Sequence, residues 1–497
     1  MGSNCTKESY NEDLLNSNHV QFKLMQSVHN EPYDGIYDQV GQIGTGSTCQ
    51  VMKVKAPRWR QRKVLKESTI DSTLINDFET SRHFAIKEIS GVTSGMITEF
   101  ENEIKLLKAI DHPRVVKIFQ TFRLEKNRIS AILMEMCQGG DLFSRPSYTE
   151  VESSVIVEQI LSASAYLHDR NVVHRDLKHQ NVLFVDNEHL DIKIIDFGLA
   201  KKYQKKTDRH YEKCGTMYTM SPEALNGNYT GSSTDLWSIG VITYMLLSNQ
   251  KPFNGNDMNE VKKEILKKDV SFTEDVWKST SKEAQNFVSS LLHKTPAKRP
   301  TANEALTQHF IERHYRRDAL LKADPELRLK IHDSIKQFVS YSVFKKVILQ
   351  MIASRYPAKE ILDLTHIFTD IDTTRRGTIS FAEFKGLFLD RSYKDTELKS
   401  MFNLIALNRT GNIMYTEFLA CTLDAKGPID QKRFLEIFEQ IDRSHKGYIT
   451  KEDLRRILPR SITDKYLQNL LKGANVNRNV GLSFEMFLAS HTNGKHT

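Results

Sequence analysis

The chain has 497 residues, of which 39% are hydrophobic and 27% are charged, and its formal net charge is +8. This composition is typical of a globular protein with a sizeable core, and the length predicts two or three domains. The charge is too small for this length to indicate a nucleic-acid-binding protein. The longest apolar run, around Ile239 to Leu247, is too short to span a bilayer. The five cysteines have no paired spacing, which is typical of a reducing compartment.

The N-terminus carries a lipidation pattern. Met1-Gly2-Ser3-Asn4-Cys5-Thr6 fits N-myristoylation of Gly2 once Met1 is removed, and Cys5 offers a second acylation site. Two acyl chains are what stable anchoring requires. We therefore expect a cytoplasmic protein held at the cytoplasmic face of a membrane by a flexible acylated leader over residues 1–36. The alternative is a chance match to a short pattern.

A glycine-rich segment follows a strand-like run. Ile43-Gly44-Thr45-Gly46-Ser47 leads into Cys49 and Val51, and glycines let a backbone approach phosphate groups without a Cβ in the way. Further on, Ala85-Ile86-Lys87 predicts a strand that carries a lysine, and Glu103 lies in a helical run beyond it.

The strongest signal is His174-Arg175-Asp176-Leu177-Lys178-His179-Gln180-Asn181, followed by Asp196-Phe197-Gly198. These segments bring proton- and metal-handling groups together, which is most of what phosphoryl transfer needs. Ser221-Pro222-Glu223 follows, and Arg299 is its expected ion-pair partner. In this order the motifs resemble the protein-kinase family, and Leu177-Lys178 resembles its serine/threonine members.

The resemblance implies a role for each matched residue. Asp176 would accept the proton of the substrate hydroxyl, Lys178 would steady the phosphoryl group, and Lys87 would be oriented by Glu103. Asn181 and Asp196 would hold Mg²⁺. The residues expected to bind ATP are Ile43, Gly44, Thr45, Gly46, Ser47, Val51, Ala85, Lys87, Met134, Glu135, Cys137 and Asp141.

The sequence departs from the family pattern in two regions. His179 and Gln180 replace the usual Pro-Glu, and that Glu contacts a substrate arginine in many relatives. We therefore expect protein substrates that carry Ser or Thr and are possibly basic, with a weakened preference for arginine. Glu212 lies where an activating phosphate often sits and could pair with Arg175; the alternative is a solvated glutamate. Thr207, Tyr203 and Tyr211 are candidate phosphorylation sites.

The segment after the kinase motifs predicts an amphipathic helix. Asp324-Pro325-Glu326 is a helix start, and the pattern continues to Pro357, with Lys345, Lys346 and Gln350 facing away from the apolar side. Such a helix is a usual ligand for a calmodulin-like groove, and the alternative is an ordinary core helix.

Four segments then repeat about every 35 residues. Their turn glycines are Gly377, Gly411 and Gly447, with a degenerate fourth near Val480, and their central apolar residues are Ile379, Ile413, Ile449 and Leu482. This is the frame of four EF-hands that pair into two lobes. The whole order resembles the calcium-dependent protein kinases of plants and protists, which implies intramolecular control of the kinase by the EF-hands through the junction helix.

The predicted fold is an α+β bilobal protein-kinase fold followed by an all-α calmodulin-like EF-hand region. We place the kinase at 37–311, the junction helix at 312–357, and the EF-hand pairs at 358–424 and 425–497. Within the kinase, residues 55–83 form a long basic connection, which we interpret as a solvated insertion.

The EF-hand loops are short of ligands. A working loop needs oxygens at positions 1, 3, 5, 7 and 9 and a bidentate Glu at 12. The first loop keeps Asp372 and Glu383 but has Arg376 at position 5, and the second begins at Ala406. The third has Asp442, Ser444 and the shorter Asp453, with Lys446 between them; the fourth has no carboxylate at positions 1, 3, 5 or 12.

We therefore interpret the chain as a membrane-tethered serine/threonine kinase whose EF-hand region binds Ca²⁺ poorly or not at all and acts as a clamp or docking surface. ATP and Mg²⁺ are the expected cofactors, and no nucleic acid is expected as a partner. One alternative is a Ca²⁺-activated kinase that uses the third or first loop. Another is a pseudokinase scaffold, against which Lys87, Asp176, Asn181 and Asp196 all argue.

Overall fold

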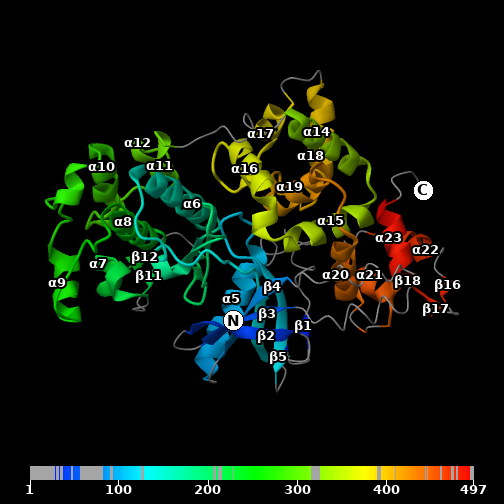
Figure 1. Ribbon diagram of the computed structural model, residues 1–497, viewed down its shortest axis with the longest axis horizontal. Coiled ribbons are helices and arrows are strands. Elements are labelled where there is room, and N and C mark those ends of the chain that lie inside the picture. Colours follow the sequence, from blue (N-terminus) through cyan, green and yellow to red (C-terminus); the bar gives the residue numbers. More distant parts are fainter. Residues whose placement is uncertain are drawn as a thin grey trace, which may run out of the picture.

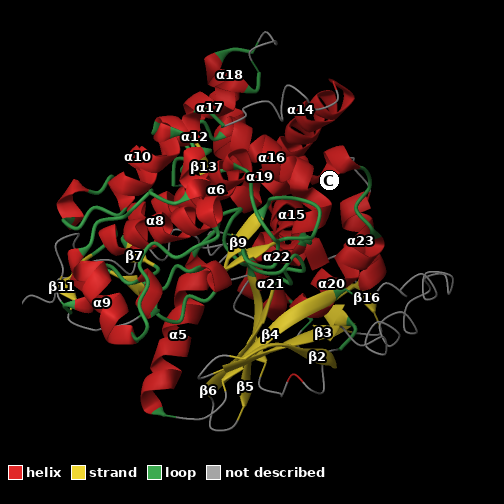
Figure 2. Ribbon diagram, turned by 60° about the vertical axis from the view of Figure 1, so that its left-hand side comes forward, coloured by secondary structure: helices red, strands yellow, loops and turns green. Residues whose placement is uncertain are grey.

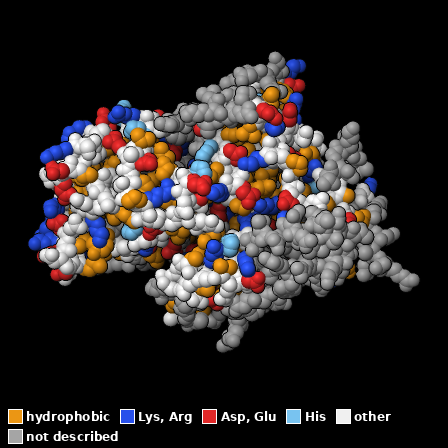
Figure 3. Space-filling model, viewed as in Figure 1, with side chains coloured by type: hydrophobic (Ala, Val, Ile, Leu, Met, Phe, Trp, Pro, Cys, Tyr) orange, Lys and Arg blue, Asp and Glu red, His pale blue; other side chains and the backbone are white. Residues whose placement is uncertain are grey.

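The computed structural model describes residues 28–29, 33, 37–45, 49–55, 82–89, 93–124, 128–204, 209–210, 215–227, 229–314, 325–388, 393–408, 410–442, 444, 446–458, 462–471, 475–476 and 479–492. Three bodies pack together: a small lobe built on a sheet, a large helical lobe, and a second helical region that lies against both (Figure 1). On the visible face, cationic and anionic side chains are intermixed over the described parts (Figure 3), as the mild net charge predicts.

The small lobe is a six-stranded sheet in the order β1-β5-β6-β4-β3-β2 with one helix, α5, against it. Its neighbouring strands are antiparallel except for β1 and β5, which are parallel. The elements are β1 (Val28–His29), β2 (Asp38–Thr45), β3 (Cys49–Lys55), β4 (His83–Ile89), α5 (Ser94–Ala109), β5 (Ile118–Leu124) and β6 (Arg128–Met134).

The end of the expected leader belongs to this lobe. Val28 and His29 pair with Thr121 and Phe122 of β5, and Tyr33 is buried in the same apolar core as Phe122. The expectation of a flexible leader up to residue 36 is corrected here, because an aromatic ring inside a core fixes the chain that carries it. Residues 1–27, with the lipidation pattern, and 56–81, most of the basic connection, lie outside the described residues.

The large lobe is built around two buried helices, α6 and α8, which pack against each other. Helix α6 begins with a capping box between Thr149 and Glu152, which satisfies the free N–H groups of its first turn. The helices are α6 (Glu150–Asp169), α7 (Pro222–Leu225), α8 (Ser233–Ser248), α9 (Met258–Lys267), α10 (Lys282–Leu291), α11 (Ala302–Leu306) and α12 (His309–Glu312). The short elements between and after them are β7 (Val172–Val173), η3 (His179–Asn181), β8 (Val182–Phe184), β9 (Ile192–Ile194), β10 (Lys201–Lys202), β11 (Arg209–His210), η4 (Met217–Thr219), β12 (Tyr229–Thr230), η5 (Asp275–Lys278) and η6 (Pro296–Lys298).

The third body contains two pairs of helix–loop–helix units. Each pair is joined by a short antiparallel ladder, with Ile379 opposite Ile413 in one and Ile449 opposite Leu482 in the other, so the predicted pairing is confirmed. The first unit pair contains η7 (Ala358–Ile361), α16 (Leu362–Ile371), β13 (Thr378–Ile379), α17 (Phe381–Gly386), α18 (Asp395–Ile405), β14 (Ile413–Met414), α19 (Tyr415–Thr422) and η8 (Leu423–Lys426). The second contains α20 (Gln431–Ile441), β15 (Tyr448–Ile449), α21 (Lys451–Ile457), α22 (Asp464–Leu471), β16 (Asn475–Val476), β17 (Asn479–Val480), β18 (Leu482–Ser483) and α23 (Phe484–Thr492).

The expected helix from Asp324 to Pro357 is divided, over the described residues from 325 onward, into α14 (Pro325–Ser340) and α15 (Val343–Arg355). Ser342 is the N-cap of α15, and its side chain accepts a hydrogen bond from the Lys345 N–H. Lys346 and Gln350, which the sequence pattern places on an outward face, are only 4% exposed. Two backbone carbonyls, of Val339 and Leu404, accept hydrogen bonds from the Lys346 ammonium. The outward-face prediction is wrong because α15 is enclosed by the apolar core of both EF-hand pairs.

Candidate functional site

The lysine of β4 is held between two carboxylates. Lys87 Nζ lies 2.7 Å and 2.9 Å from the two carboxylate oxygens of Glu103 on α5, and 2.9 Å from Asp196 Oδ1. Burial disfavours the ammonium form, but the nearby charges of Glu103 and Asp196 outweigh it and raise the pKa of Lys87. The lysine is therefore a fixed cation at the junction of the two lobes, as the sequence predicts.

The catalytic-loop carboxylate of Asp176 is buried within a polar network. Lys178 Nζ lies 2.7 Å from Asp176 Oδ2, and Asn181 Nδ2 donates to the same oxygen and to the Asp176 carbonyl. The Thr216 N–H and hydroxyl both lie 3.0 Å from Asp176 Oδ1. The predicted residues Asp176, Lys178 and Asn181 are therefore brought together. Thr216 joins them from the far end of the loop that follows Asp196, and sequence reasoning missed it.

A buried aspartate fixes the backbone of this loop. The carboxylate of Asp235, in the first turn of α8, accepts from the N–H groups of His174 and Arg175 and lies 2.9 Å from His168 Nε2. Arg175 and Asp196 both have left-handed backbones, with φ of 67° and 62°, a costly conformation that surrounding contacts must hold. Sequence reasoning missed this anchoring role.

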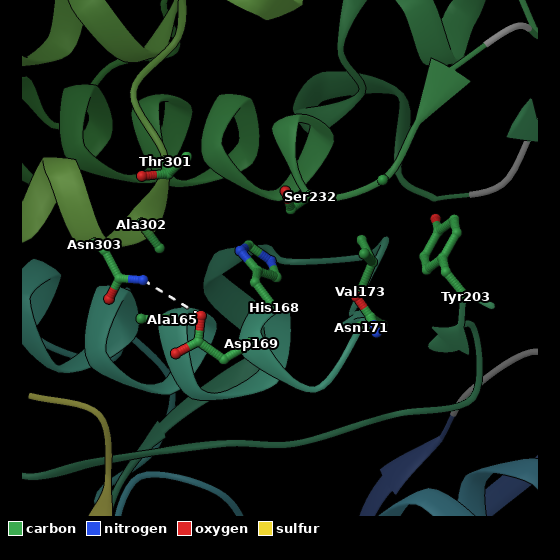
Figure 4. A pocket seen from close by; sticks show the side chains of 11 residues that line it. Ala165, His168, Asp169, Asn171, Val173, Tyr203, Ser232, Thr301, Ala302 and Asn303 are labelled. Atoms are coloured by element: carbon green, nitrogen blue, oxygen red, sulfur yellow. Dashed lines mark hydrogen bonds between the residues drawn. The ribbon is translucent and has the colours of Figure 1, made fainter. Parts of the chain in front are cut away.

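A small cavity of about 130 Å³ lies next to the anchor, between the end of α6, the start of α8 and α11 (Figure 4). His168, Asp169 and Asn303 line it, and Asn303 donates a weak hydrogen bond of 3.4 Å to Asp169. Residues predicted to act in catalysis or nucleotide binding do not line it, so the cavity is separate from the cleft.

The described nucleotide-binding residues that the sequence predicts come from β2, β3, β4 and β6 and from the segment after β6. Gly44 and Thr45 end β2 opposite Val51 and Gln50 of β3, and Ala85 is buried on β4. Met134 ends β6, where the chain crosses to the large lobe, and Lys193 Nζ lies 3.1 Å from Glu135 beyond it. Ile43, Cys137 and Asp141 remain at least partly exposed. Gly46 and Ser47 lie outside the described residues.

The segment after Asp196 is partly described. Arg299 and Glu223 form two hydrogen bonds of 2.6 Å and 2.8 Å, which confirms the expected buried pair. Tyr203 is only 5% exposed, so its hydroxyl is a poor target for modification. Thr207, Tyr211 and Glu212 lie outside the described residues.

The cleft fits ATP and Mg²⁺ by the chemistry of its donors. Asp196 and Asn181 supply the carboxylate and amide oxygens that Mg²⁺ prefers; Asp196 lies beside Lys87, and Asn181 lies beside Asp176. The Lys87 cation is suited to phosphate oxygens. Phe197, buried against His174 at 4.8 Å between ring centres, keeps Asp196 turned toward the lysine.

The first EF-hand loop is closed by its own hydrogen bonds. Asp372 accepts from the N–H groups of Arg376 and Gly377 and from the Thr374 hydroxyl, while Glu383 accepts from the Thr374 N–H and the Thr373 hydroxyl. Burial, together with the charge of Glu383, raises the pKa of Asp372 to about 7. The exposed side chain of Arg376 belongs to the same loop.

The second loop is closed in the same way. Both oxygens of Glu417 are occupied, because they accept from the Asn408 N–H, the Asn408 side-chain amide and the Met414 N–H. Burial raises the pKa of Glu417 to about 8. Ala406 offers no side-chain oxygen at the first position.

In the third loop, the described donors to the two carboxylates are different residues. Asp442 accepts from the N–H groups of Lys446 and Gly447, and Asp453 pairs with Arg456 at 2.9 Å. The Ser444 hydroxyl donates a long hydrogen bond of 3.4 Å to Asp442 Oδ1. In the fourth loop the backbone forms a hairpin in which Asn475 is opposite Val480.

Arg375, in the first loop, is inserted into the large lobe. Its side chain is 3% exposed; Nη1 donates to the Leu306 carbonyl at 2.7 Å, Nη2 donates to Glu312 at 3.0 Å, and Nε lies 3.8 Å from Glu158. Its own carbonyl accepts from the Ser162 hydroxyl of α6. This residue adopts φ of 55°, a left-handed conformation that points the guanidinium away from the loop's centre.

Gly377 of the same loop makes the close approach possible. A Cβ at this position would lie 2.1 Å from His112 Cδ2, and its φ is 68°, so only glycine fits both the space and the backbone. The second loop docks beside it, where Asp111 of the kinase accepts from the N–H and hydroxyl of Thr416 at 3.0 Å and 2.7 Å. Kinase and EF-hand region thus share a polar interface that includes α6 of the large lobe and Asp111 just after α5; Figure 2 shows α16 and α19 next to α6.

The interface continues to the hinge. His366 lies 2.9 Å from Asp191, which also pairs with Arg114, and the Lys117 ammonium lies 4.8 Å from the centre of the Tyr415 ring. Burial lowers the pKa of Lys117 to about 8. A cavity of about 390 Å³ lies beyond, between Glu135 and Met136 of the hinge and the first residues of the EF-hand region. Sequence reasoning missed this surface, because its partners are far apart in the chain.

Comparison with known proteins identifies the domains. The protein kinase domain model matches residues 37–311, and models of an EF-hand domain pair and an EF-hand domain match 360–391 and 433–463. Among the described residues, none of the helices combines the length and apolar character needed to cross a membrane.

Three relatives extend the likeness over most of the chain. Calcium-dependent protein kinase 4 of Plasmodium falciparum (isolate 3D7) is 31% identical over 86% of this chain and 84% of its own. Calcium-dependent protein kinase 5 of the same organism is 30% identical over 94% and 80%. Calcium-dependent protein kinase 7 of Oryza sativa subsp. japonica is 31% identical over 84% and 77%. The chain therefore belongs to the calcium-dependent protein kinase family, and it is a serine/threonine protein kinase with EF-hands.

Proposed function

We propose that this kinase is held in a catalytically ordered form by its EF-hand region, which acts as a clamp and binds Ca²⁺ weakly or not at all. The observation that carries the proposal is the first EF-hand loop. Its carboxylates are taken up by its own N–H and hydroxyl groups, while Arg375 makes its contacts with the kinase. A loop used in this way is a structural connector.

Asp176 accepts the proton of the substrate Ser or Thr hydroxyl in the proposed reaction. Its oxygens already bind Lys178, Asn181 and Thr216, so its orientation is fixed before the substrate arrives. Lys178 steadies the moving phosphoryl group, and Lys87 holds the α- and β-phosphates. Mg²⁺ ions held by Asp196 and Asn181 would neutralise charge on the β- and γ-phosphates.

Ca²⁺ fits the first two loops poorly. In the first, a cation would have to displace the N–H groups that Asp372 and Glu383 accept from, and Arg376 adds positive charge. In the second, Glu417 is occupied and Ala406 contributes nothing at position 1. Ca²⁺ affinity follows the number and charge of the ligands, which supports weak binding at both loops.

A second candidate function is activation by Ca²⁺ through the third loop. The observation in its favour is that, among the described residues of this loop, Asp442 and Asp453 accept hydrogen bonds from different donors, and that they lie in the EF-hand pair that does not carry Arg375. The relatives are also named calcium-dependent. Lys446 at position 5 weakens the site, and we therefore place this candidate second.

Attachment to the cytoplasmic face of a membrane through acylation of Gly2 and Cys5 remains part of the proposal. It follows from the N-terminal pattern, which lies outside the described residues. A mild net charge of +8 would add little to the binding, so both acyl chains are needed.

Replacing Asp176 by Asn tests its catalytic role. We expect kcat to fall by at least about 100-fold, because general-base catalysis is lost while the geometry is kept. Steady-state phosphorylation of a Ser/Thr peptide measures this, and nucleotide binding should persist. The control is Asp169→Asn, which makes the same change at an exposed aspartate at the end of α6 and should leave kcat unchanged. Activity of Asp176→Asn within tenfold of the wild type would contradict the assignment.

Replacing Arg375 by Ala tests the clamp. Removal of one partner from a buried ion pair costs on the order of 3 kcal/mol, and Glu158, only 9% exposed, would be left without its partner. We expect weaker docking, measured as a lower unfolding temperature of the kinase domain and increased proteolysis between the domains. Arg376→Ala, which removes an exposed cation of the same loop, should change neither. Equal effects of the two variants would count against the clamp.

Calcium dependence is tested by the activity of the full-length chain in Ca²⁺ and in chelator at fixed Mg²⁺. We expect rates equal within about twofold, because each closed loop must lose hydrogen bonds before it can bind the ion. Strong stimulation by Ca²⁺ would favour the second candidate. In that case Asp442→Ala should abolish the response and Asp372→Ala should leave it intact.

A further inference from the structure

The substrate side of the cleft begins at Thr216, which binds Asp176. The next residues, Met217 and Tyr218, form η4, and α9 packs against this element. A protein substrate that presents its hydroxyl to Asp176 must therefore pass close to η4 and to the residues that cover it.

A lysine is fixed on this surface. Lys251 Nζ lies 3.7 Å from the centre of the Tyr218 ring, where the negative face of the ring attracts the ammonium. The residue is exposed. Within the part of the chain that the structure describes, no ion pair joins Lys251 to a carboxylate. Because the residue is exposed, its ammonium is accessible to a bound substrate.

Among the described residues, the polar groups of the neighbouring cleft have contacts of their own. Lys178 is paired with Asp176, and Asp141 accepts a hydrogen bond from the Phe143 N–H. The His179 ring packs edge-on against Phe143 at 4.6 Å. Burial lowers the pKa of His179, and the nearby charges of Lys178 and Lys251 lower it further while Asp141 opposes them, so the imidazole is neutral at pH 7.

The position that often carries a glutamate in this family is also uncharged. Gln180 is exposed on the catalytic loop, and an amide offers a substrate arginine no counter-charge. Asp141 is a carboxylate on the hinge side of the cleft. Among the described residues, Lys251 thus offers an anionic side chain a counter-charge that Gln180 does not offer to an arginine, contrary to the weakened preference for arginine that the sequence suggested.

We propose that Lys251, held over Tyr218, forms a subsite for an anionic side chain of the protein substrate, so that this kinase selects Ser or Thr residues with an acidic or phosphorylated residue nearby. The inference rests on the kinase activity of the proposed function and adds a substrate class to it. An acidic residue and a phosphorylated one share the same chemistry at Lys251, and the test separates them.

The experiment measures kcat/KM for a peptide series in which one position at a time, from four before to four after the target Ser, is Ala, Glu, phosphoserine or Arg. The wild type should prefer Glu to Ala at one position or more by about two- to fivefold, the range of an exposed ion pair, and phosphoserine at least as strongly. Lys251→Ala should abolish the preference, and Lys251→Glu should reverse it in favour of Arg. High salt should reduce it.

Lys278→Glu is the matched control, because it reverses the charge of a lysine that is 78% exposed and pairs only with the nearby Asp275; it should retain the wild-type preference. A wild type that prefers Arg at every position, or a Lys251→Glu variant with unchanged ratios, would overturn the proposal. Each series is run in Ca²⁺ and in chelator. A calcium effect multiplies all rates alike and reports on the clamp, whereas the ratio between peptides reports on Lys251.

Discussion

The arrangement of this molecule depends on the burial of one arginine across two domains. Arg375 adopts a left-handed backbone conformation in the EF-hand loop. Its side chain contacts Leu306, Glu312 and Glu158 of the large lobe. A buried guanidinium is stable only when its donors are occupied, so the loop can keep this conformation only while docked. Gly377 next to it lets the loop lie against His112. The contact ties the position of the EF-hand region to the large lobe.

The same contact connects the regulatory region to the catalytic centre. The helix that carries Glu158 and Ser162 also carries His168, which binds the Asp235 anchor of the catalytic loop. On the small-lobe side, Asp111 and Lys117 meet the second EF-hand loop just beyond the helix that carries Glu103. Docking therefore touches both lobes near the elements that fix Lys87 and Asp176. The first loop is both closed by its own hydrogen bonds and docked on the kinase in this one conformation.

Much of this could be predicted from the sequence. Lys87, Glu103, Asp176, Asn181 and Asp196 were found because their spacing follows directly from the chemistry, and the structure brings them together. The pairing of Ile379 with Ile413 followed from the repeat.

The interface could not be predicted, because local patterns do not show which distant surface a residue will meet. Lys346 and Gln350 look like an outward face of a helix, yet they are enclosed by two EF-hand pairs at once. Arg375 resembles its exposed neighbour Arg376 in sequence, and only its φ and its partners in α6 and α12 distinguish the two.

The most direct test of this account is hydrogen exchange of the full-length chain in chelator, followed at the amides of Asp111 to Lys117 and of α6 around Ser162. The account predicts that these amides are protected without Ca²⁺ and that adding Ca²⁺ leaves the protection unchanged, because protein groups alone hold the interface. Protection that develops only when Ca²⁺ is added would contradict it, since the ion would then be needed for docking.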